Sequence, residues 1–407
     1  RIICKIGCLL FSQDGEKGLF MIIKQIHSMT DVNPMCWNNL VHNKDPFLRH
    51  EFLLALEKSG SASEQTGWLP HHLLVESQHQ LIAAMPLYLK THSRGEYVFD
   101  QQWADAYVQS GIAYYPKWLN AIPFTPCQGQ RILIKENQDE QAIIQACIAF
   151  ITELSELNNI SSLHCLFPDA SQTEALQQQL LIRENIQFQW FNNNYRDFAD
   201  YLQQFTSRKR KQIHKERQQI KNAGIQMVRV RGLEISAQHW QVFFQFYQLT
   251  YLKRGQSAYL NIDFFQQLAA SMPEQILLVL AIKDQRYVGA ALSFIGAETL
   301  YGRYWGCYQE YKHLHFETCY YQGLDYCIEQ KLQRFDSGAQ GEHKIARGFK
   351  PITTYSAHWI QHPHFSTLIT DFLNREKVLI QQYKQQCYQQ LPFHQQHNEK
   401  NKNLFPS

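Results

Sequence analysis

The alternation of helix-like and strand-like segments constrains the fold of this chain more than any other feature of its sequence. In the first half, helical patterns separated by apolar runs occupy 46–58, 101–109, 139–157 and 171–183. In the second half, they occupy 207–222, 237–252, 262–270, 316–332 and 368–388. Strand-like runs lie between them at 72–76, 80–89, 131–135, 162–167, 186–191, 225–230, 274–282, 287–295, 299–305, 334–336 and 353–360. This alternation predicts an α/β or α+β fold with mixed sheets flanked by helices.

The two halves repeat one order of elements, which predicts a duplicated unit. Each half has a hairpin whose second strand carries small residues, Ala83-Ala84 in one and Gly289-Ala290 in the other. A chain of 407 residues has room for two or three domains of ordinary size. We expect an N-terminal extension, with Met21 as a candidate start, then two domains, a C-terminal helix and a disordered tail, at 1–27, 28–195, 196–365, 366–392 and 393–407.

Composition excludes several classes of protein. The 44% hydrophobic and 18% charged residues allow a sizeable core and exclude wholesale disorder. The net charge of +3 does not by itself indicate binding to nucleic acid or a membrane. The 10 cysteines are scattered without a Cys-x-x-Cys pair, which predicts reduced thiols and a cytoplasmic protein. No run approaches the roughly 18–20 apolar residues of a spanning helix.

Several catalytic and cofactor signatures are missing from the sequence. It has no Gly-x-Ser-x-Gly, no P-loop and no dinucleotide-binding fingerprint, which argues against a serine hydrolase, an NTPase and a Rossmann dehydrogenase. Pairs of histidines occur at 71–72, 313–315 and 362–364, but none has a carboxylate or cysteine at a known ligand spacing. We therefore expect no metal site.

Residues 337–351, SGAQGEHKIARGFKP, concentrate ionisable side chains between three glycines. His343 is suited to proton transfer near neutral pH, and Glu342 is a second candidate base if it is desolvated. Lys344 and Arg347 are candidates for holding a carboxylate or phosphate of the substrate. The alternative is a solvated loop with ordinary ion pairs.

A basic helix is predicted at 207–222, with Ser207 as its N-cap. Its first turns carry Arg208, Lys209, Arg210 and Lys211, which are candidates for binding phosphates of a nucleotide-linked substrate or RNA. The alternative is a solvated surface helix.

Two further polar clusters are candidates for contacting substrate. His92, Glu96 and Tyr97 follow the first hairpin and lead into an aromatic stretch. Residues 303–305, which are Arg303, Tyr304 and Trp305, lie on the predicted central strand of the second half. The alternative for the aromatic residues is a place in the core. Residues 113–130 hold three prolines and are predicted to be a long loop.

Strings of residues along most of the chain resemble the FemAB-like acyltransferases, and especially a bacterial group described as predicted N-acyltransferases or peptidoglycan-biosynthesis-like proteins. The matching strings lie within 28–365, at 46–48 (PFL), 55–57 (ALE), 66–68 (TGW), 86–93 (PLYLKTHS), 95–100 (GEYVFD), 114–117 (YYPK), 123–126 (PFTP) and 338–344 (GAQGEHK). The resemblance implies tandem duplicated GNAT-like (acyl-CoA N-acyltransferase-like) domains. It implies an N-acyltransferase or aminoacyltransferase acting on an amine of a peptidoglycan-related or other small precursor.

The acyl donor implied by the resemblance is acyl-CoA or aminoacyl-tRNA. GNAT enzymes that use acetyl-CoA carry an Arg/Gln-x-x-Gly-x-Gly/Ala loop after the central strand, where helix N–H groups hold pyrophosphate. At the corresponding place this chain reads CYQEYKHLH over 307–315, which departs from that loop, as FemAB-like proteins also do. Two alternatives stay open: a non-catalytic protein that binds a cell-wall precursor or RNA, and an acyl-CoA-dependent N-acetyltransferase.

Overall fold

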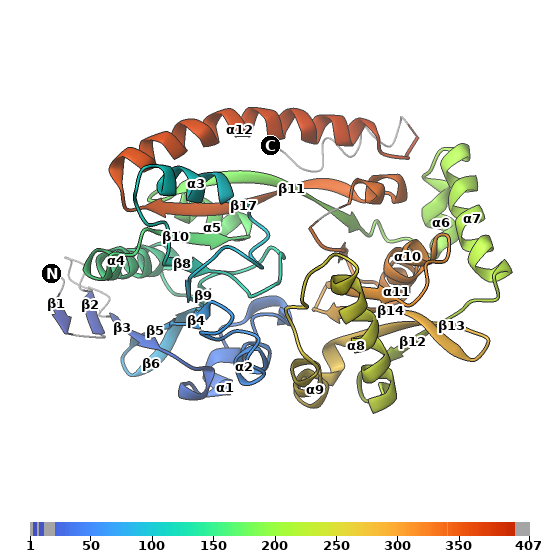
Figure 1. Cartoon of the computed structure of the whole chain (residues 1–407), viewed down its shortest axis with the longest axis horizontal. Helices are drawn as coiled ribbons and strands as arrows, with labels where there is room; N and C mark the ends of the chain where they lie inside the picture. Colours follow the sequence, from blue (N-terminus) through green and yellow to red (C-terminus); the bar gives the residue numbers. More distant parts are fainter. Residues whose placement is uncertain (1–2, 6–7, 12–20, 340, 395–407) are drawn as a thin grey trace. The chain divides into compact units, whose positions relative to one another are not determined.

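The computed structural model describes residues 3–5, 8–11, 21–339 and 341–394, and it contains two compact units (Figure 1). The first unit comprises residues 1–185 with 353–380, and the second comprises 186–352 with 381–407. The predicted division at 195/196 and 365/366 differs from these boundaries. The difference arises because residues 356–360 pair with the strand at 162–166 and so belong to the first unit.

The first unit contains two sheets. One has the order β1-β2-β3-β5-β6-β9, formed by Ile3–Lys5, Cys8–Phe11, Met21–Ile26, His72–Ser77, Gln80–Met85 and Leu133–Ile134. The other has the order β4-β7-β8-β10-β17, formed by Trp68–Pro70, Tyr88–Lys90, Lys117–Asn120, Ser162–Leu166 and Lys350–Ile360. The predicted extension at 1–27 is wrong for its last part, because β3 pairs antiparallel with β5 and buries Met21 and Ile23.

Helices cover the sheets of the first unit. They are α1 (Pro34–Asn38), α2 (His50–Lys58), α3 (Gln101–Gln109), α4 (Glu140–Asn158), α5 (Ala170–Leu176) and the first part of α12 (Pro363–Gln389). The side chain of Asp139 caps α4, whose apolar residues join a core with the strands. Helices α3 and α12 meet through Tyr107 and Phe365, whose rings stack with centroids 3.9 Å apart.

The second unit is built on a single series of strands. Its order is β12-β13-β14-β15-β16-β11, formed by Gln226–Arg231, Ile276–Lys283, Arg286–Ile295, Thr299–Cys307, Arg334–Asp336 and the second half of Leu181–Phe191. Strands β13, β14 and β15 pair in chain order as an antiparallel meander. Strand β16 joins β15 in parallel and antiparallel β11 lies beyond it, so the chain re-enters the sheet here after a helix.

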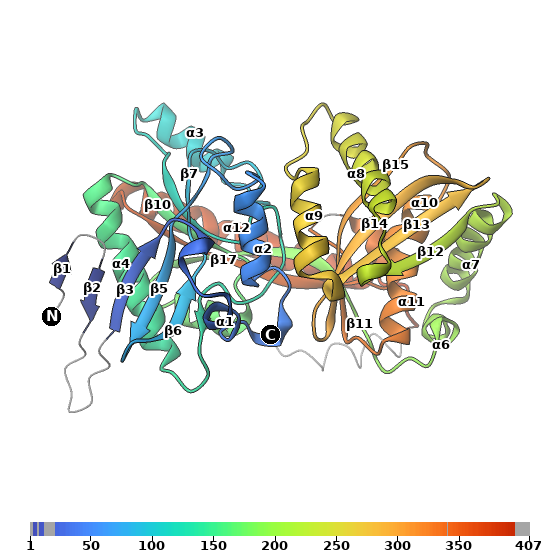
Figure 2. The same cartoon turned by 90° about the horizontal axis from the view of Figure 1, so that it is seen from below.

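Helices lie on both sides of these strands (Figure 2). One side carries α8 (Ala237–Leu252) and α9 (Ile262–Ser271), and the other carries α10 (Leu314–Phe316), the π-helix η5 (Glu317–Tyr321) and α11 (Gln322–Glu329). Helices α6 (Phe198–Gln203) and α7 (Ser207–Asn222) precede the first strand of the meander. Short 3₁₀ turns are η1 (Met29–Asp31), η2 (His42–Lys44), η3 (Gly232–Glu234), η4 (Pro273–Gln275) and η6 (Glu342–Arg347).

Several sequence-based assignments are wrong, each for a local reason. The strand predicted at 80–89 is broken at Pro86 into β6 and β7, because proline cannot donate to a ladder. The predicted loop at 113–130 contains β8, and the predicted helix at 171–183 ends at Leu176, so that residues from Leu181 onward belong to β11. Ser207 is not the N-cap of α7, since Thr206 holds that position.

The chain beyond α12 continues as part of the second unit. Phe393 is buried and forms a bridge with Phe205, so the predicted tail at 393–407 is wrong at its first residues. The rest of that predicted tail lies outside the described residues. Within the part of the chain that the structure describes, no helix is long and apolar enough to span a membrane.

Candidate functional site

The glycine-rich segment predicted to be functional forms the turn between β16 and β17 in the second unit. Gly338, Gly341 and Gly348 have φ values of 92°, 113° and 81°, which are strained for any residue with a Cβ atom. Between the last two glycines, Glu342–Arg347 forms η6. The glycines therefore begin and end one compact turn that carries all four predicted ionisable side chains.

Lys344 lies at the centre of this turn and is fully buried. Its Nζ donates to the carbonyl oxygen of Gly338 at 2.5 Å. Desolvation lowers the pKa of Lys344 to about 8, although the nearby Asp336 carboxylate favours its charged form. Asp336 in turn accepts from the Gly338 amide at 3.0 Å and pairs with Arg303 at 3.3 Å. Through these contacts Lys344 and Arg303 shape the turn, and their contact with substrate stays a prediction.

Arg347 connects the turn to helix α7. Its Nη2 donates to Glu216 Oε2 at 2.7 Å, and its Nη1 donates to the His343 carbonyl oxygen at 2.8 Å. Its guanidinium stacks 3.4 Å from the ring centroid of Phe316. Glu216 also accepts a short hydrogen bond from the Tyr321 hydroxyl. Because Arg347 is buried and bound to these partners, it holds the turn in place, and its contact with substrate stays a prediction.

His343 is an exposed residue of the turn whose ring packs against Phe316 and Tyr320, with centroids 5.6 and 5.4 Å away. Its Nε2 is hydrogen-bonded to the Tyr320 hydroxyl at 2.8 Å, and that hydroxyl lies 3.3 Å from His315 Nε2. Desolvation, together with the positive charges of Arg347 and Lys344, lowers the pKa of His343 to about 4. The ring is therefore neutral at pH 7 and can accept a proton.

The π-helix η5 supplies the partners of the turn. Residues 317–321 widen the helix by one residue in each hydrogen-bonded ring, a distortion that is common at functional sites. Within this short stretch Tyr320 contacts His343 while Tyr321 contacts Glu216. The sequence predicts an uninterrupted helix at 316–332, so the π-helix is a correction. The sequence pattern of a helix does not by itself predict where a π-helical turn will interrupt it.

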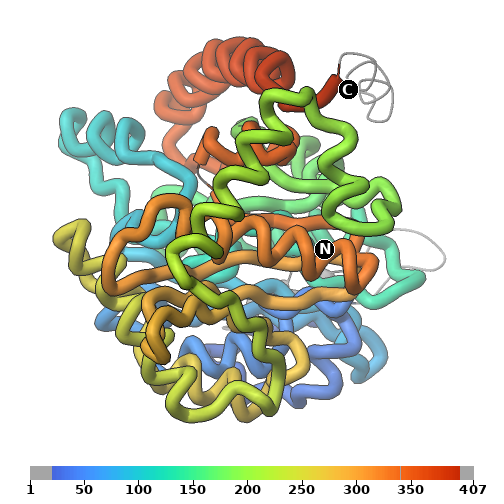
Figure 3. The backbone as a smooth tube through the Cα atoms, turned by 90° about the vertical axis from the view of Figure 1, so that its right-hand side faces the viewer, coloured from blue at the N-terminus to red at the C-terminus, as the bar shows by residue number. Residues whose placement is uncertain are grey.

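Helix α7 has a buried side and a basic start. Its buried side carries Ile213, Glu216 and Ile220, and Arg217 pairs there with Glu317 at 3.0 Å and Asp325 at 2.6 Å. The backbone of α7 is drawn in yellow-green in Figure 3. The predicted phosphate-binding residues lie at its start, where Arg208 and Lys211 are exposed, Arg210 is half-buried, and Lys209 is half-buried on the face of Ile213 and Glu216. Within the described ranges, no ion pair joins these four cations to a carboxylate. The exposed cations at the start of α7 are therefore open to an anionic partner.

Three other predicted site residues have different surroundings. Glu342 is exposed, and its carboxylate accepts a short hydrogen bond from Tyr383, so it lacks the desolvation that a base at this place requires. Tyr304 packs against Tyr247 and Phe265, with ring centroids 5.3 and 5.8 Å away, and so belongs to the aromatic core under α8 and α9. Trp305 points to the opposite side of β15, where its ring lies 5.2 Å from His315.

The remaining predicted residues lie in the first unit. His92 bonds through Nε2 to the Thr66 carbonyl oxygen at 3.0 Å, and desolvation lowers its pKa. Tyr97 adopts a φ of 62° in the same segment. Glu96 is buried and accepts from Lys117 Nζ at 2.8 Å, while desolvation raises its pKa to about 7. His92, Glu96 and Tyr97 therefore all lie in one short segment of the first unit.

A buried charged cluster surrounds Glu96. Lys117 is bound by Ser93 at 2.7 Å and by a short contact to Asp100. Lys90 is fully buried with its Nζ 3.9 Å from the ring centroid of Trp68, and desolvation lowers its pKa to about 7. Glu96 stands between these two lysines in sequence, and its carboxylate stabilises the charged forms of both.

Sequence reasoning missed the residues that bind the predicted ones. Glu216 was detectable, because it lies between Ile213 and Ile220 at the spacing of one helical face and is the acidic member of a buried stripe. Tyr320 and Lys117 carried no comparable signal. No group of three or more residues suited to hold a metal ion occurs among the described parts of the chain.

Comparisons with known proteins agree with this architecture. The sequence model of the FemAB-like family, described as peptidoglycan biosynthesis/recognition, matches residues 28–395. The solved structure of FemX is 12% identical, covers 85% of this chain and 100% of its own, and has a TM-score of 0.50. The C-terminal domain of a putative lysylphosphatidylglycerol synthetase from Agrobacterium fabrum is 8% identical, with coverages of 85% and 97% and a TM-score of 0.53.

A tandem GNAT protein from the clavulanic acid biosynthesis pathway also matches, at 10% identity with coverages of 84% and 99% and a TM-score of 0.44. A comparison with curated protein sequences found no match. The predicted mixed α/β fold is confirmed, and it is similar to the fold of FemX.

Proposed function

Because this chain belongs to the FemAB-like family, we propose that it is an N-acyltransferase or aminoacyltransferase that acts on an amine of a peptidoglycan-related precursor. Relatives in this family and with this fold are transferases, which supports the reaction class. We further propose that the acyl group arrives on a polyanionic carrier, an aminoacyl-tRNA. The donor and the acceptor are inferences from the site and the family together.

The proposed reaction joins the amine nitrogen to the acyl carbonyl carbon and breaks the carbon–oxygen bond to the carrier. A base must take the proton that the amine loses, and the carrier hydroxyl must gain one as it leaves. His343 suits the first task, since the residue lies at the surface and its ring is neutral at pH 7 and oriented by Tyr320. Arg347 and Lys344 hold the turn that presents this ring, which supplies the alignment on which such transfers depend.

The basic start of α7 is the observation that carries the choice of donor. Arg208 and Lys211 are exposed at the start of α7 and Lys209 and Arg210 lie between them, half-buried, while Glu216 on the buried face binds Arg347 of the turn. One helix thus offers cations for phosphate contacts at its start and supports the proposed base through Glu216. Cations that neutralise phosphates give affinity that falls steeply with salt.

The proposal is tested with a variant that combines Arg208→Gln, Lys209→Gln and Arg210→Gln. We expect its affinity for tRNA to fall by at least about tenfold at low salt, with a shallower dependence on salt concentration. The matched control combines Lys58→Gln, Lys135→Gln and Lys331→Gln, three exposed lysines, and should bind tRNA as the wild type does. Equal losses of tRNA affinity in both variants would mean that the change in net charge alone explains the effect, and would contradict a binding site at the start of α7.

The catalytic part is read from the same preparations by mass spectrometry of candidate amine acceptors incubated with aminoacyl-tRNA or with acyl-CoA. We expect transfer from aminoacyl-tRNA, and a loss of about 10²–10⁴-fold with His343→Ala, the range for general acid–base groups. Transfer from acyl-CoA alone would overturn the proposed donor. tRNA binding without any transfer would favour a non-catalytic binding protein.

A further inference from the structure

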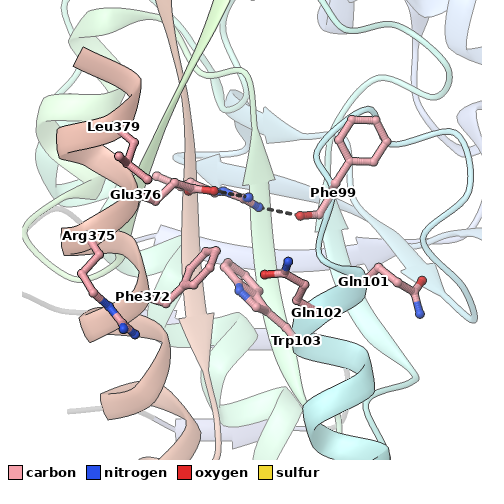
Figure 4. A pocket seen from close by; sticks show the side chains of 9 residues that line it. Phe99, Gln101, Gln102, Trp103, Phe372, Arg375, Glu376 and Leu379 are labelled. Carbon is pink, nitrogen blue, oxygen red and sulfur yellow. Dashed lines mark hydrogen bonds and ion pairs between the residues drawn. The ribbon is translucent and has the colours of Figure 1, made fainter. Parts of the chain in front are cut away.

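A cavity of about 580 Å³ opens within the first unit, between the start of α3 and the middle of α12 (Figure 4). Its volume falls in the range of about 300–1,000 Å³ that small-molecule sites occupy. All of its lining residues belong to the first unit, and none belongs to the transferase site described above. We call it the α3–α12 pocket.

The α3–α12 pocket has an aromatic wall. Trp103 is buried at its base and meets Phe372 of α12 edge to face, with ring centroids 6.5 Å apart. At the mouth, Phe99 is 69% exposed and Leu379 is 64% exposed. Large apolar side chains left open to water on both sides of one cavity indicate a surface that a ligand can cover favourably. Because aromatic rings pack well against one another, this wall favours a ligand with a flat ring over one with a flexible chain.

A fixed arginine forms the polar part of the pocket. Arg183 of β11 donates from Nε and Nη2 to the two carboxylate oxygens of Glu376, each at 2.7 Å, and from Nη1 to the Phe99 carbonyl oxygen at 2.7 Å. Its guanidinium carbon lies 5.4 Å from the Trp103 ring centroid. Three of the five N–H groups of an arginine are thereby used, and two are left for a ligand. The planar group is held ready without the entropy cost of ordering it.

The charge balance of the pocket favours an anion. Glu376 neutralises Arg183, and the exposed Arg375 adds a further positive charge, with its Nε on the Asp371 carbonyl oxygen at 3.2 Å. The exposed amides of Gln101 and Gln102 offer further donors and acceptors at the side of α3 (Figure 4). The lining therefore combines aromatic surface with one net positive charge and hydrogen-bonding groups.

We propose that the α3–α12 pocket binds a small ligand in which a planar aromatic ring carries a carboxylate or a phosphate. The ring lies against Trp103, Phe372 and Phe99, and the anionic group meets Arg375 and the unused N–H groups of Arg183. This ligand site is separate from the proposed transferase function, and its existence does not depend on that function. A nucleoside monophosphate and an aromatic carboxylic acid share this chemistry.

Calorimetric titration of the full chain with AMP and with benzoate tests the proposal, with adenosine and benzyl alcohol as their uncharged counterparts. We expect at least one anionic probe to bind about tenfold more tightly than its counterpart. Binding of AMP alone assigns a nucleotide, and binding of benzoate alone assigns an aromatic carboxylate. The proposal is overturned if neither anionic probe binds in the millimolar range, or if the uncharged counterparts bind equally well.

Variants of exposed residues locate the binding without disturbing the core. Phe99→Ala and Arg375→Gln should each weaken the anionic probe about tenfold. Their matched controls are Val108→Ala, which removes an exposed apolar side chain of α3, and Lys58→Gln, which removes an exposed charge of α2. Wild-type affinity in both pocket variants would place the binding elsewhere and overturn the assignment.

Discussion

Replacement of Lys344 with methionine offers the sharpest test of the buried chemistry at the turn. The side chain is fully buried and donates a hydrogen bond to the Gly338 carbonyl oxygen at 2.5 Å. Desolvation lowers the pKa of Lys344 from 10.5 to about 8, and the positive charge of Arg303 adds to this effect. Methionine has a similar length and no charge, so Lys344→Met removes the titration while keeping most of the packing.

The sign of the effect follows from proton binding. In the unfolded chain a lysine keeps its proton up to about pH 10.4, whereas folded Lys344 loses it near pH 8. Between these values the unfolded state binds more protons, so the free energy of unfolding rises with pH by about 1.4 kcal/mol per pH unit. From about pH 7 to about pH 10, the wild type should gain roughly 2–3 kcal/mol relative to Lys344→Met.

The measurement is urea-induced unfolding of the wild type and Lys344→Met at a series of pH values across this range. Taking the difference between the two proteins removes the titration of all other groups. Lys221→Met, a change of an exposed lysine in the same unit, is the control and should run parallel to the wild type. If the wild type and Lys344→Met show the same dependence on pH, the reasoning from desolvation of Lys344 is wrong.

Two further predictions concern the same unit. Glu216→Ala should lower the free energy of unfolding by about 3–5 kcal/mol, because it leaves the buried Arg347 without its carboxylate. Adding Arg347→Met should recover part of this loss. A loss below about 1 kcal/mol in denaturant-induced unfolding would contradict the pairing. Gly348→Ala should destabilise more than Gly224→Ala, since both have positive φ but only the Cβ at 348 would lie 2.1 Å from the Tyr201 hydroxyl. We expect about 1–2 kcal/mol for the 224 variant and clearly more for the 348 variant, and equal thermal shifts would refute the clash.

Much of the fold could be predicted because it depends on local patterns. The helices at 101–109, 207–222 and 237–252 match α3, α7 and α8 at both ends, since apolar periodicity and flanking turn residues act within a few positions. The predictions that failed involve longer-range context. Strand β8 lies among prolines and aromatic residues, and it is a strand because β7 and β10 flank it on both sides.

The candidate site was predictable in position and less so in role. The glycine spacing at 338–348 located the turn, and the residue types marked His343 as a group for proton transfer. The roles of Lys344 and Arg347 could not be inferred, because they depend on burial and on partners from other elements. The sequence pattern of a glycine-rich segment is the same whether its charged residue contacts a ligand or pairs with a buried carboxylate of the protein.

The alternation of elements, the glycines that permit the turn at 338–348 and the basic residues at the start of α7 can all be read from the amino-acid sequence. Which charged side chains pair inside the protein and which stay exposed depends on the folded arrangement. The pairing of Arg347 with Glu216 joins residues 131 positions apart, and that of Lys117 with Glu96 is set by one buried cluster. The physical reason is that desolvation and charge pairing depend on neighbours in space, which local periodicity does not specify.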